Sequence, residues 1–173
     1  MPEKKMMTSA YANKLLKKLS EDKEFWLSRE NDGCMYVAAV TEEPVVPDYD
    51  FEEVSSHINE IDMEIVRIKH AINLANVTNT IKCGAGELTI DAVLVRMAQL
   101  NRRKSALDMM RKQQPKVRLS SGYAPAGRNA APEYRYINYD LERVKQEYDR
   151  IDAEISEMQI ALDRYNQTVE FEV

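Results

Sequence analysis

The chain has 173 residues, of which 31% are charged and 8% aromatic, and its formal net charge is -5. That length fits one domain with a sizeable hydrophobic core, and the small net charge gives no global field that would favour nucleic acids or membranes. Cys34 and Cys83 are too few for a disulfide scaffold or a zinc cluster, and no apolar run reaches the ~18 residues of a membrane span or forms a signal peptide. We therefore expect a cytoplasmic protein, in the host cytoplasm if the gene is viral, without a membrane partner.

Residues 9–30 are predicted to form the first helix, with Ser9 as its N-cap. Its apolar face is supplied by Leu15, Leu16, Leu19, Phe25 and Trp26. A polar turn ends this helix, and the apolar run that follows at residues 34–40 is compatible with an edge strand. Pro44 and Pro47 then mark a linker.

Two long helices are predicted over residues 50–77 and 138–166, because each carries an unbroken heptad repeat of apolar residues. The first repeat consists of Phe51, Val54, Ile58, Ile61, Ile65, Ile68, Ile72 and Ala75. The second consists of Leu141, Val144, Tyr148, Ile151, Ile155, Met158, Leu162 and Tyr165. Asp50 and Glu53 give the first of these helices a capping-box-like start. Each seam must face another helix, either within the chain or in a second copy.

A third helix is predicted over residues 88–114, where Thr89 is the cap and Pro115 ends the helix. A short glycine turn separates it from the helix at 50–77. We therefore expect these two helices to form an antiparallel hairpin.

Charge is distributed unevenly between the third helix and the last one. From residue 96 to residue 118 there are eight Lys or Arg residues and one acid, whereas residues 140–173 contain ten acids and four bases. Because opposite charges on adjacent helices attract, this imbalance predicts ion pairs between neighbouring helices of one bundle.

The segment at residues 116–137 has a composition that does not suit a helical bundle, since it is rich in Gly, Pro, Arg and Tyr. A β-hairpin arm and a mobile loop both fit, and long irregular segments in compact domains are usually functional or disordered. Residues 168–173 alternate like a strand and are expected to pair with the segment at 34–40 or with the arm. The prediction is a mainly α fold in a single domain (1–173): an elongated antiparallel helical bundle or coiled-coil hairpin with a small β-hairpin arm or short strands.

Two groups of side chains are candidates for binding a small anionic ligand. The arm brings together guanidinium groups, hydroxyls and aromatic rings, which can grip a phosphate and stack on a base. Asn and Thr side chains crowd the end of the helix at 50–77, although this also fits an ordinary helix terminus. With two arginines of the third helix, the candidate ligand-binding residues are Asn73, Asn76, Thr78, Arg96, Arg103, Arg118, Ser120, Tyr123, Arg128, Tyr134, Arg135 and Tyr136. A solvated loop, or an arm that embraces a neighbouring subunit, is an equally good interpretation of the arm.

Signatures of catalysis and metal binding are missing from the sequence. There is no glycine-rich phosphate loop and no nucleophile elbow. His57 and His70 lack the Glu-x-x-His spacing of helical di-iron sites. Carboxylates such as Asp149 and Asp152 would need to converge inside a bundle to hold magnesium, but they lie beside the heptad seam rather than on it. We therefore predict no catalytic residues, no metal site and no cofactor.

Several short motifs resemble a family of small, poorly characterised helical proteins from bacteria and their phages, some of which carry the label septicolysin. The motif residues are Ile72, Asn73, Ala75, Asn76 and Thr78, then Gly86, Leu88, Thr89 and Arg96, then Arg135 and Tyr136, and finally Leu162, Asp163 and Asn166. The resemblance covers most of the chain from Phe51 onward and implies an elongated helical hairpin that associates with itself. It implies no mechanism, and the insertion at residues 122–131 is longer than the family pattern, which leaves any shared ligand open.

The leading hypothesis is a non-enzymatic homo-oligomer that binds or sequesters a small anionic, nucleotide-like ligand. In a phage, such a protein would act as a sponge for a nucleotide signal of host immunity. The alternative from another class is a structural or protein–protein interaction module, in which the arm wraps a neighbour and the basic helix docks on an acidic surface. A metal-dependent nucleotide hydrolase is a third alternative, and there is no strong signal for nucleic-acid binding.

Overall fold

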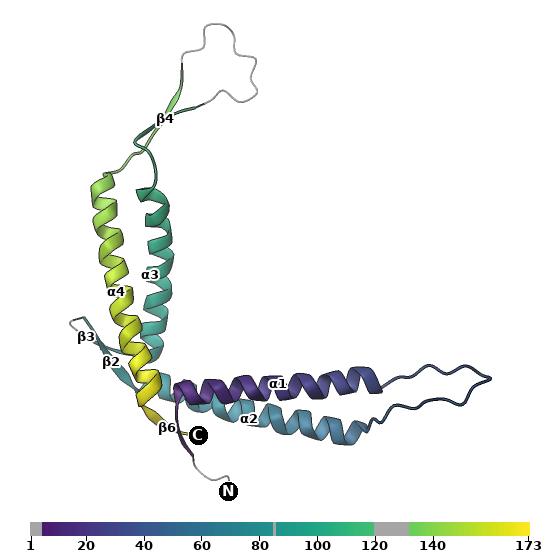
Figure 1. Cartoon of the computed structure of the whole chain (residues 1–173). Coiled ribbons are helices and arrows are strands. Elements are labelled where there is room, and N and C mark those ends of the chain that lie inside the picture. Colours follow the sequence, from purple (N-terminus) through teal and green to yellow (C-terminus); the bar gives the residue numbers. More distant parts are fainter. Residues whose placement is uncertain (1–4, 85, 120–131) are drawn as a thin grey trace.

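The computed structural model describes residues 5–84, 86–119 and 132–173, and it confirms a mainly α protein with short antiparallel strand pairs (Figure 1). The helices are α1 (Ser9–Gly33), α2 (Phe51–Thr78), α3 (Ile90–Arg111) and α4 (Leu141–Thr168). The strands are β1 (Met6–Thr8), β2 (Thr80–Cys83), β3 (Gly86–Thr89), β4 (Lys116–Arg118), β5 (Tyr134–Tyr136) and β6 (Glu170–Glu172). No helix in the described ranges is long and apolar enough to cross a membrane.

The four helices form two arms that meet at a corner, which gives the molecule the shape of an L (Figure 1). α1 packs along α2 in one arm, and α3 packs along α4 in the other, so that each arm has its own hydrophobic core. This pairing differs from the antiparallel hairpin predicted for residues 50–77 and 88–114. The reason is that α1 covers the heptad seam of α2, while the β2–β3 hairpin redirects the chain into the other arm.

In the α1–α2 arm, the heptad seam of α2 faces α1. Val54 and Ile68 on this seam are fully buried, whereas Phe51 at its start remains 64% exposed. Lys23 of α1 pairs with Asp62 of α2 at 2.6 Å. Apolar contacts along the seam and this ion pair therefore hold the two helices of the arm together.

The N-caps of α2 and α3 are the residues predicted from the sequence, whereas the N-cap of α1 is one residue earlier than predicted. The N-cap of α1 is Thr8, whose hydroxyl accepts a backbone hydrogen bond at 3.3 Å, so the predicted cap Ser9 lies inside the helix and is buried. Asp50 caps α2 as predicted, because its carboxylate accepts a hydrogen bond from the backbone N–H of Glu53 at 3.0 Å. Thr89 is the N-cap of α3, also as predicted.

In the α3–α4 arm, apolar residues of both helices form one continuous core. It consists of Ile90, Val93, Met97, Leu100 and Leu107 from α3 and Val144, Ile151, Met158, Leu162 and Tyr165 from α4. Beside this core, Arg96 pairs with Glu154 at 2.8 Å, and Lys104 pairs with Asp152. These ion pairs confirm the predicted charge complementarity between neighbouring helices.

The two chain ends come together at the corner. β1 and β6 pair in antiparallel fashion with Met7 opposite Phe171, and both side chains are buried against α2. The strand predicted at residues 168–173 is therefore present as β6. The prediction that it pairs with the run at 34–40 or with the arm is wrong, because β6 pairs with β1 instead.

A linker of residues 34–50 joins α1 to α2 at the far end of their arm (Figure 1). All of these residues are described and none lies in a strand, so the edge strand predicted at 34–40 is wrong. The returning half of the linker contains Pro44 and Pro47, which have no N–H to donate to a ladder. The apolar run at 34–40 consequently has no strand partner within the described chain and lies exposed to solvent.

Candidate functional site

At the far end of the α3–α4 arm, β4 and β5 form a two-stranded antiparallel ribbon (Figure 1). Lys116 lies opposite Tyr136, and Arg118 lies opposite Tyr134. Two further backbone hydrogen bonds, of 2.9 and 3.3 Å, extend the ladder by one residue pair at each end. The sequence is compatible with either a β-hairpin arm or a mobile loop, and the described ends of the arm form a β-hairpin.

One face of the ribbon combines two cations with two aromatic rings. Because side chains alternate between the faces of a strand, Lys116, Arg118, Tyr134 and Tyr136 share one face, which we call the tyrosine face. The Lys116 ammonium lies 4.2 Å from the centroid of the Tyr134 ring and 5.5 Å from that of Tyr136, and the two ring centroids are 6.4 Å apart. All four side chains are exposed, so a partner can reach them from solvent.

The positive charge of the ribbon is not neutralised by nearby acids. In the part of the chain that the structure describes, no carboxylate lies within ion-pair distance of Lys116, Arg118 or Arg135. Charged donors without a carboxylate partner are suited to an external phosphate or carboxylate group. The ribbon therefore has the electrostatics of an anion-binding surface.

The last turn of α3 provides a fixed base for the ribbon. The Asp108 carboxylate accepts hydrogen bonds from Lys112 and Arg111, and these bonds hold the pKa of Asp108 below its ordinary value. The Arg111 guanidinium carbon also lies 4.0 Å from the centroid of the Tyr148 ring on α4. The Tyr139 hydroxyl donates a 2.7 Å hydrogen bond to a backbone carbonyl in this turn. These contacts tie the chain on both sides of the ribbon to the helical arm.

A hollow of about 430 Å³ lies at the base of the ribbon. It is lined by Gln113, Gln114, Arg135, Tyr136, Ile137, Asn138 and Tyr139. Its amides, guanidinium group and phenols offer both donors and acceptors to a polar ligand. Gln113, Gln114 and Asn138 were not among the residues predicted from the sequence, because their residue types are common at helix ends.

The Asn and Thr candidates lie at the corner, far from the ribbon. Asn73, Asn76 and Thr78 belong to the last turns of α2, where the Thr78 hydroxyl donates to the Leu74 carbonyl at 2.8 Å. The 22 residues of α3 separate the corner from the ribbon, a length of ~33 Å at 1.5 Å per residue. One small ligand cannot touch both groups within one chain, so the corner residues fit the helix-terminus interpretation.

The remaining candidates fall into three sets. Arg96 is engaged by Glu154, whereas Arg103 is exposed farther along α3. The structure brings together Arg118, Tyr134, Arg135 and Tyr136 in the ribbon. Outside the described residues lie Ser120, Tyr123 and Arg128.

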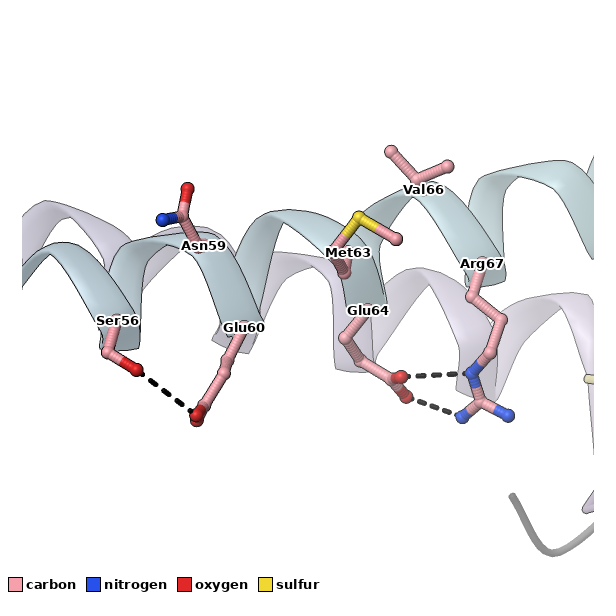
Figure 2. A pocket seen from close by; sticks show the side chains of 7 residues that line it. All are labelled: Ser56, Asn59, Glu60, Met63, Glu64, Val66 and Arg67. Carbon is pink, nitrogen blue, oxygen red and sulfur yellow. Dashed lines mark hydrogen bonds and ion pairs between the residues drawn. The ribbon is translucent and has the colours of Figure 1, made fainter. Parts of the chain in front are cut away.

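A separate open hollow of about 700 Å³ lies along the exposed side of α2 (Figure 2). It is lined by Ser56, Asn59, Glu60, Met63, Glu64, Val66 and Arg67. The Ser56 hydroxyl donates to Glu60 at 3.5 Å, and the Arg67 guanidinium donates two hydrogen bonds to Glu64 at 2.9 and 2.6 Å. Because these groups already bond one another along the helix, this hollow is a poorer candidate for a polar ligand than the base of the ribbon.

One carboxylate considered as a magnesium ligand, that of Asp152, has another partner. In the described ranges, no three His, Cys, Asp or Glu side chains group together as metal ligands do. Asp152 and Glu154 pair with the α3 cations Lys104 and Arg96. Their observed role is to join α3 to α4.

A solved structure with a similar fold is that of a functionally unknown conserved protein from Corynebacterium diphtheriae. The TM-score is 0.62 over 96% of this chain and 99% of that chain, at 15% sequence identity. No protein-family model and no curated protein sequence matches the chain. The resemblance to the septicolysin-labelled family stays a prediction. At this level of identity the structural likeness shows the fold alone, so an argument about function must start from the chain's own residues.

Proposed function

We propose that this protein is a non-enzymatic binding protein that holds an anionic, nucleotide-like group on the ribbon at the end of the α3–α4 arm. The tyrosine face carries the proposal, because its cations have no carboxylate partner among the described residues and lie beside two exposed aromatic rings. We expect the protein to act in the cytoplasm, where its two free cysteines, Cys34 and Cys83, would stay reduced.

The chemistry of the ribbon matches the two parts of a nucleotide. The Arg118 guanidinium has a planar set of donors that suits phosphate oxygens, and the Tyr134 and Tyr136 rings offer faces on which a base can stack. The amides at the base of the ribbon would supply hydrogen bonds to a sugar or a base edge. Because the site is open to solvent, we expect charge-assisted contacts to dominate and binding to weaken as salt is raised.

The test is equilibrium binding of fluorescent nucleotides, both cyclic and ADP-ribose-type, to the full chain. Arg118→Ala and Lys116→Ala should each weaken binding by about 1.5 to 3 kcal/mol, or roughly 10- to 150-fold in Kd, if the side chain makes a charge-assisted contact. Failure of every nucleotide to bind, or binding that is unchanged in both variants, would rule out this function.

The matched control is Arg102→Ala, which removes the same charge from an exposed position in the middle of α3. It changes the net charge by the same amount, so a purely global electrostatic effect would weaken binding equally in all three variants. We expect Arg102→Ala to bind like the wild type. If the gene is viral, such binding would sequester a host signalling nucleotide.

A second candidate function is protein–protein interaction, which one observation favours. The apolar run at residues 34–40 is exposed at the other end of the L, with Val37 and Val40 at 99% and 105% of full exposure. Exposed apolar segments of this kind mark interaction surfaces. The two candidates use opposite ends of the molecule and are compatible with each other.

A further inference from the structure

The linker end of the α1–α2 arm is the most acidic part of the chain. Between residues 30 and 53 there are eight carboxylates and no Lys or Arg. They belong to Glu30, Asp32, Glu42, Glu43, Asp48, Asp50, Glu52 and Glu53. In the described part of the molecule, none of them forms an ion pair. We call residues 34–50, with the carboxylates that flank them, the acidic end.

The ribbon end of the other arm carries the opposite charge. Residues 116–136 contain four Lys or Arg residues and one acid, Glu133. The cations of the ribbon itself lack carboxylate partners among the described residues, as set out above. The sequence therefore places opposite net charge at the two ends of the L, which are the far ends of its two arms (Figure 1).

The backbones of the two ends are complementary as well. The ribbon is a sheet of only two strands among the described residues, so its outer edges have open hydrogen-bonding groups. The apolar run at 34–40 is rich in residues that favour strands, yet Pro44 and Pro47 deny it a partner within its own linker. Residues 35–39 of this run have no regular secondary structure, and an unpaired segment and an open sheet edge are the two components of strand addition.

The side chains would also match in such an arrangement. Addition along β5 would place the exposed Met35, Tyr36 and Val37 of one copy beside the exposed Tyr134 and Tyr136 of the ribbon. It would also place the carboxylates that follow this run near the ribbon cations.

We propose that the acidic end of one copy binds the ribbon of a second copy by adding residues 35–39 as a third strand beside β4–β5. The proposal rests on the proposed function, because it requires the ribbon to bind anionic groups, and it names a carboxylate-bearing segment of this chain as one of them. The contact is head to tail, since it joins different surfaces of the two copies. Head-to-tail contacts of an L-shaped unit produce a ring when the rotation closes and a filament when it does not.

Two charge-reversal variants test the contact. The first, Glu42→Lys with Glu43→Lys, alters only the acidic end. The second, Arg118→Glu with Arg135→Glu, alters only the ribbon. Native mass spectrometry and analytical ultracentrifugation at low salt should show an oligomer for the wild-type chain, dissociating as salt is raised, and monomers of 20.0 kDa for each variant alone.

Mixing the two variants gives the decisive measurement, because each retains the end that the other has lost. The mixture should form complexes that contain both variants, because the unaltered acidic end of one can bind the unaltered ribbon of the other and the two reversed ends are also opposite in charge. Such complexes also show that both variants are folded. The inference is overturned if the wild type stays monomeric, if either variant alone assembles like the wild type, or if the mixture forms no complex that contains both variants.

A separate readout distinguishes failure of this contact from failure of the proposed function. A fluorescent single-stranded oligonucleotide serves as an anionic probe for the ribbon of the full chain. If the wild type is monomeric but the ribbon variant loses probe binding, the contact between copies is wrong and the anion-binding function stands. If the ribbon variant binds the probe as well as the wild type does, both are wrong.

Discussion

At the scale of single residues, Asp108 holds two cations at the point where α3 ends and the ribbon begins. The hydrogen bonds from Lys112 and Arg111 lower the pKa of its carboxyl group. A carboxyl group whose pKa is lowered by folding adds stability above its unfolded pKa, and that stability is lost as pH falls through the folded pKa. The Asp108 contribution should therefore be complete at neutral pH and disappear in strong acid.

Asp108→Asn should accordingly lower the thermal midpoint at pH 7 and have a diminishing effect as the pH is lowered below the ordinary range of aspartate. The measurement is the Tm of both proteins across an acid pH series. Asp22→Asn, at an exposed position of α1, is the control, and its Tm should change with pH in the same way as that of the wild type. A Tm difference for Asp108→Asn that does not change with pH would contradict the assigned cause.

At the scale of elements, α4 contains two isoleucines with opposite environments. Ile151 is 1% exposed in the core of the α3–α4 arm, whereas Ile160 is 71% exposed on the same helix. Ile151→Ala should cost about 2 to 5 kcal/mol of unfolding free energy, because it leaves a cavity in the core. Ile160→Ala should stay within about 0.5 kcal/mol of the wild type. Urea denaturation of the two variants measures the contrast, and equal costs would contradict the core described for this arm.

The four helices could be predicted from the sequence, but their partners could not. The heptad seams at Val54 and Ile151 locate α2 and α4, because a 3.5-residue repeat marks the buried side of a helix whatever covers it. The same repeat does not say which helix does the covering, so the expected pairing of the second and third helices differs from the observed arms. Alternating residues likewise predict β6 but not its pairing with β1, which depends on where the two chain ends meet.

At the scale of the whole molecule, β1 and β6 fasten both chain ends to the corner. Phe171→Ala should loosen the corner, since the Phe171 side chain is only 9% exposed and belongs to the same core as Ile68 and Ala75 of α2. Hydrogen exchange should rise in β1, in β6 and in the last turns of α2, and remain unchanged in the ribbon. Glu170→Ala, an exposed position on the other face of β6, is the matched control. Faster exchange throughout both arms would show that the corner and the arms unfold as one unit.

The candidate site was predictable only where its residues are neighbours in sequence. Arg118 and the tyrosines of β5 come together because a hairpin pairs nearby strands, and the tyrosine-rich composition of this segment points to it directly. The Asn and Thr cluster at the corner also stands out in composition, but the length of α3 separates it from the ribbon. The amides at the base of the ribbon attract no attention in the sequence, because Gln and Asn are common at helix ends.

The arms are built from a seven-residue repeat, whereas the two ends have unrelated sequences. The length of the arms and the binding properties of the ends are therefore separate features of this molecule. Adding one heptad to both α3 and α4 would carry the ribbon ~10 Å farther from the corner without altering a single contact at either end. The length of the arms thus sets the distance between the two ends, and this distance can change in evolution without a change in what each end binds.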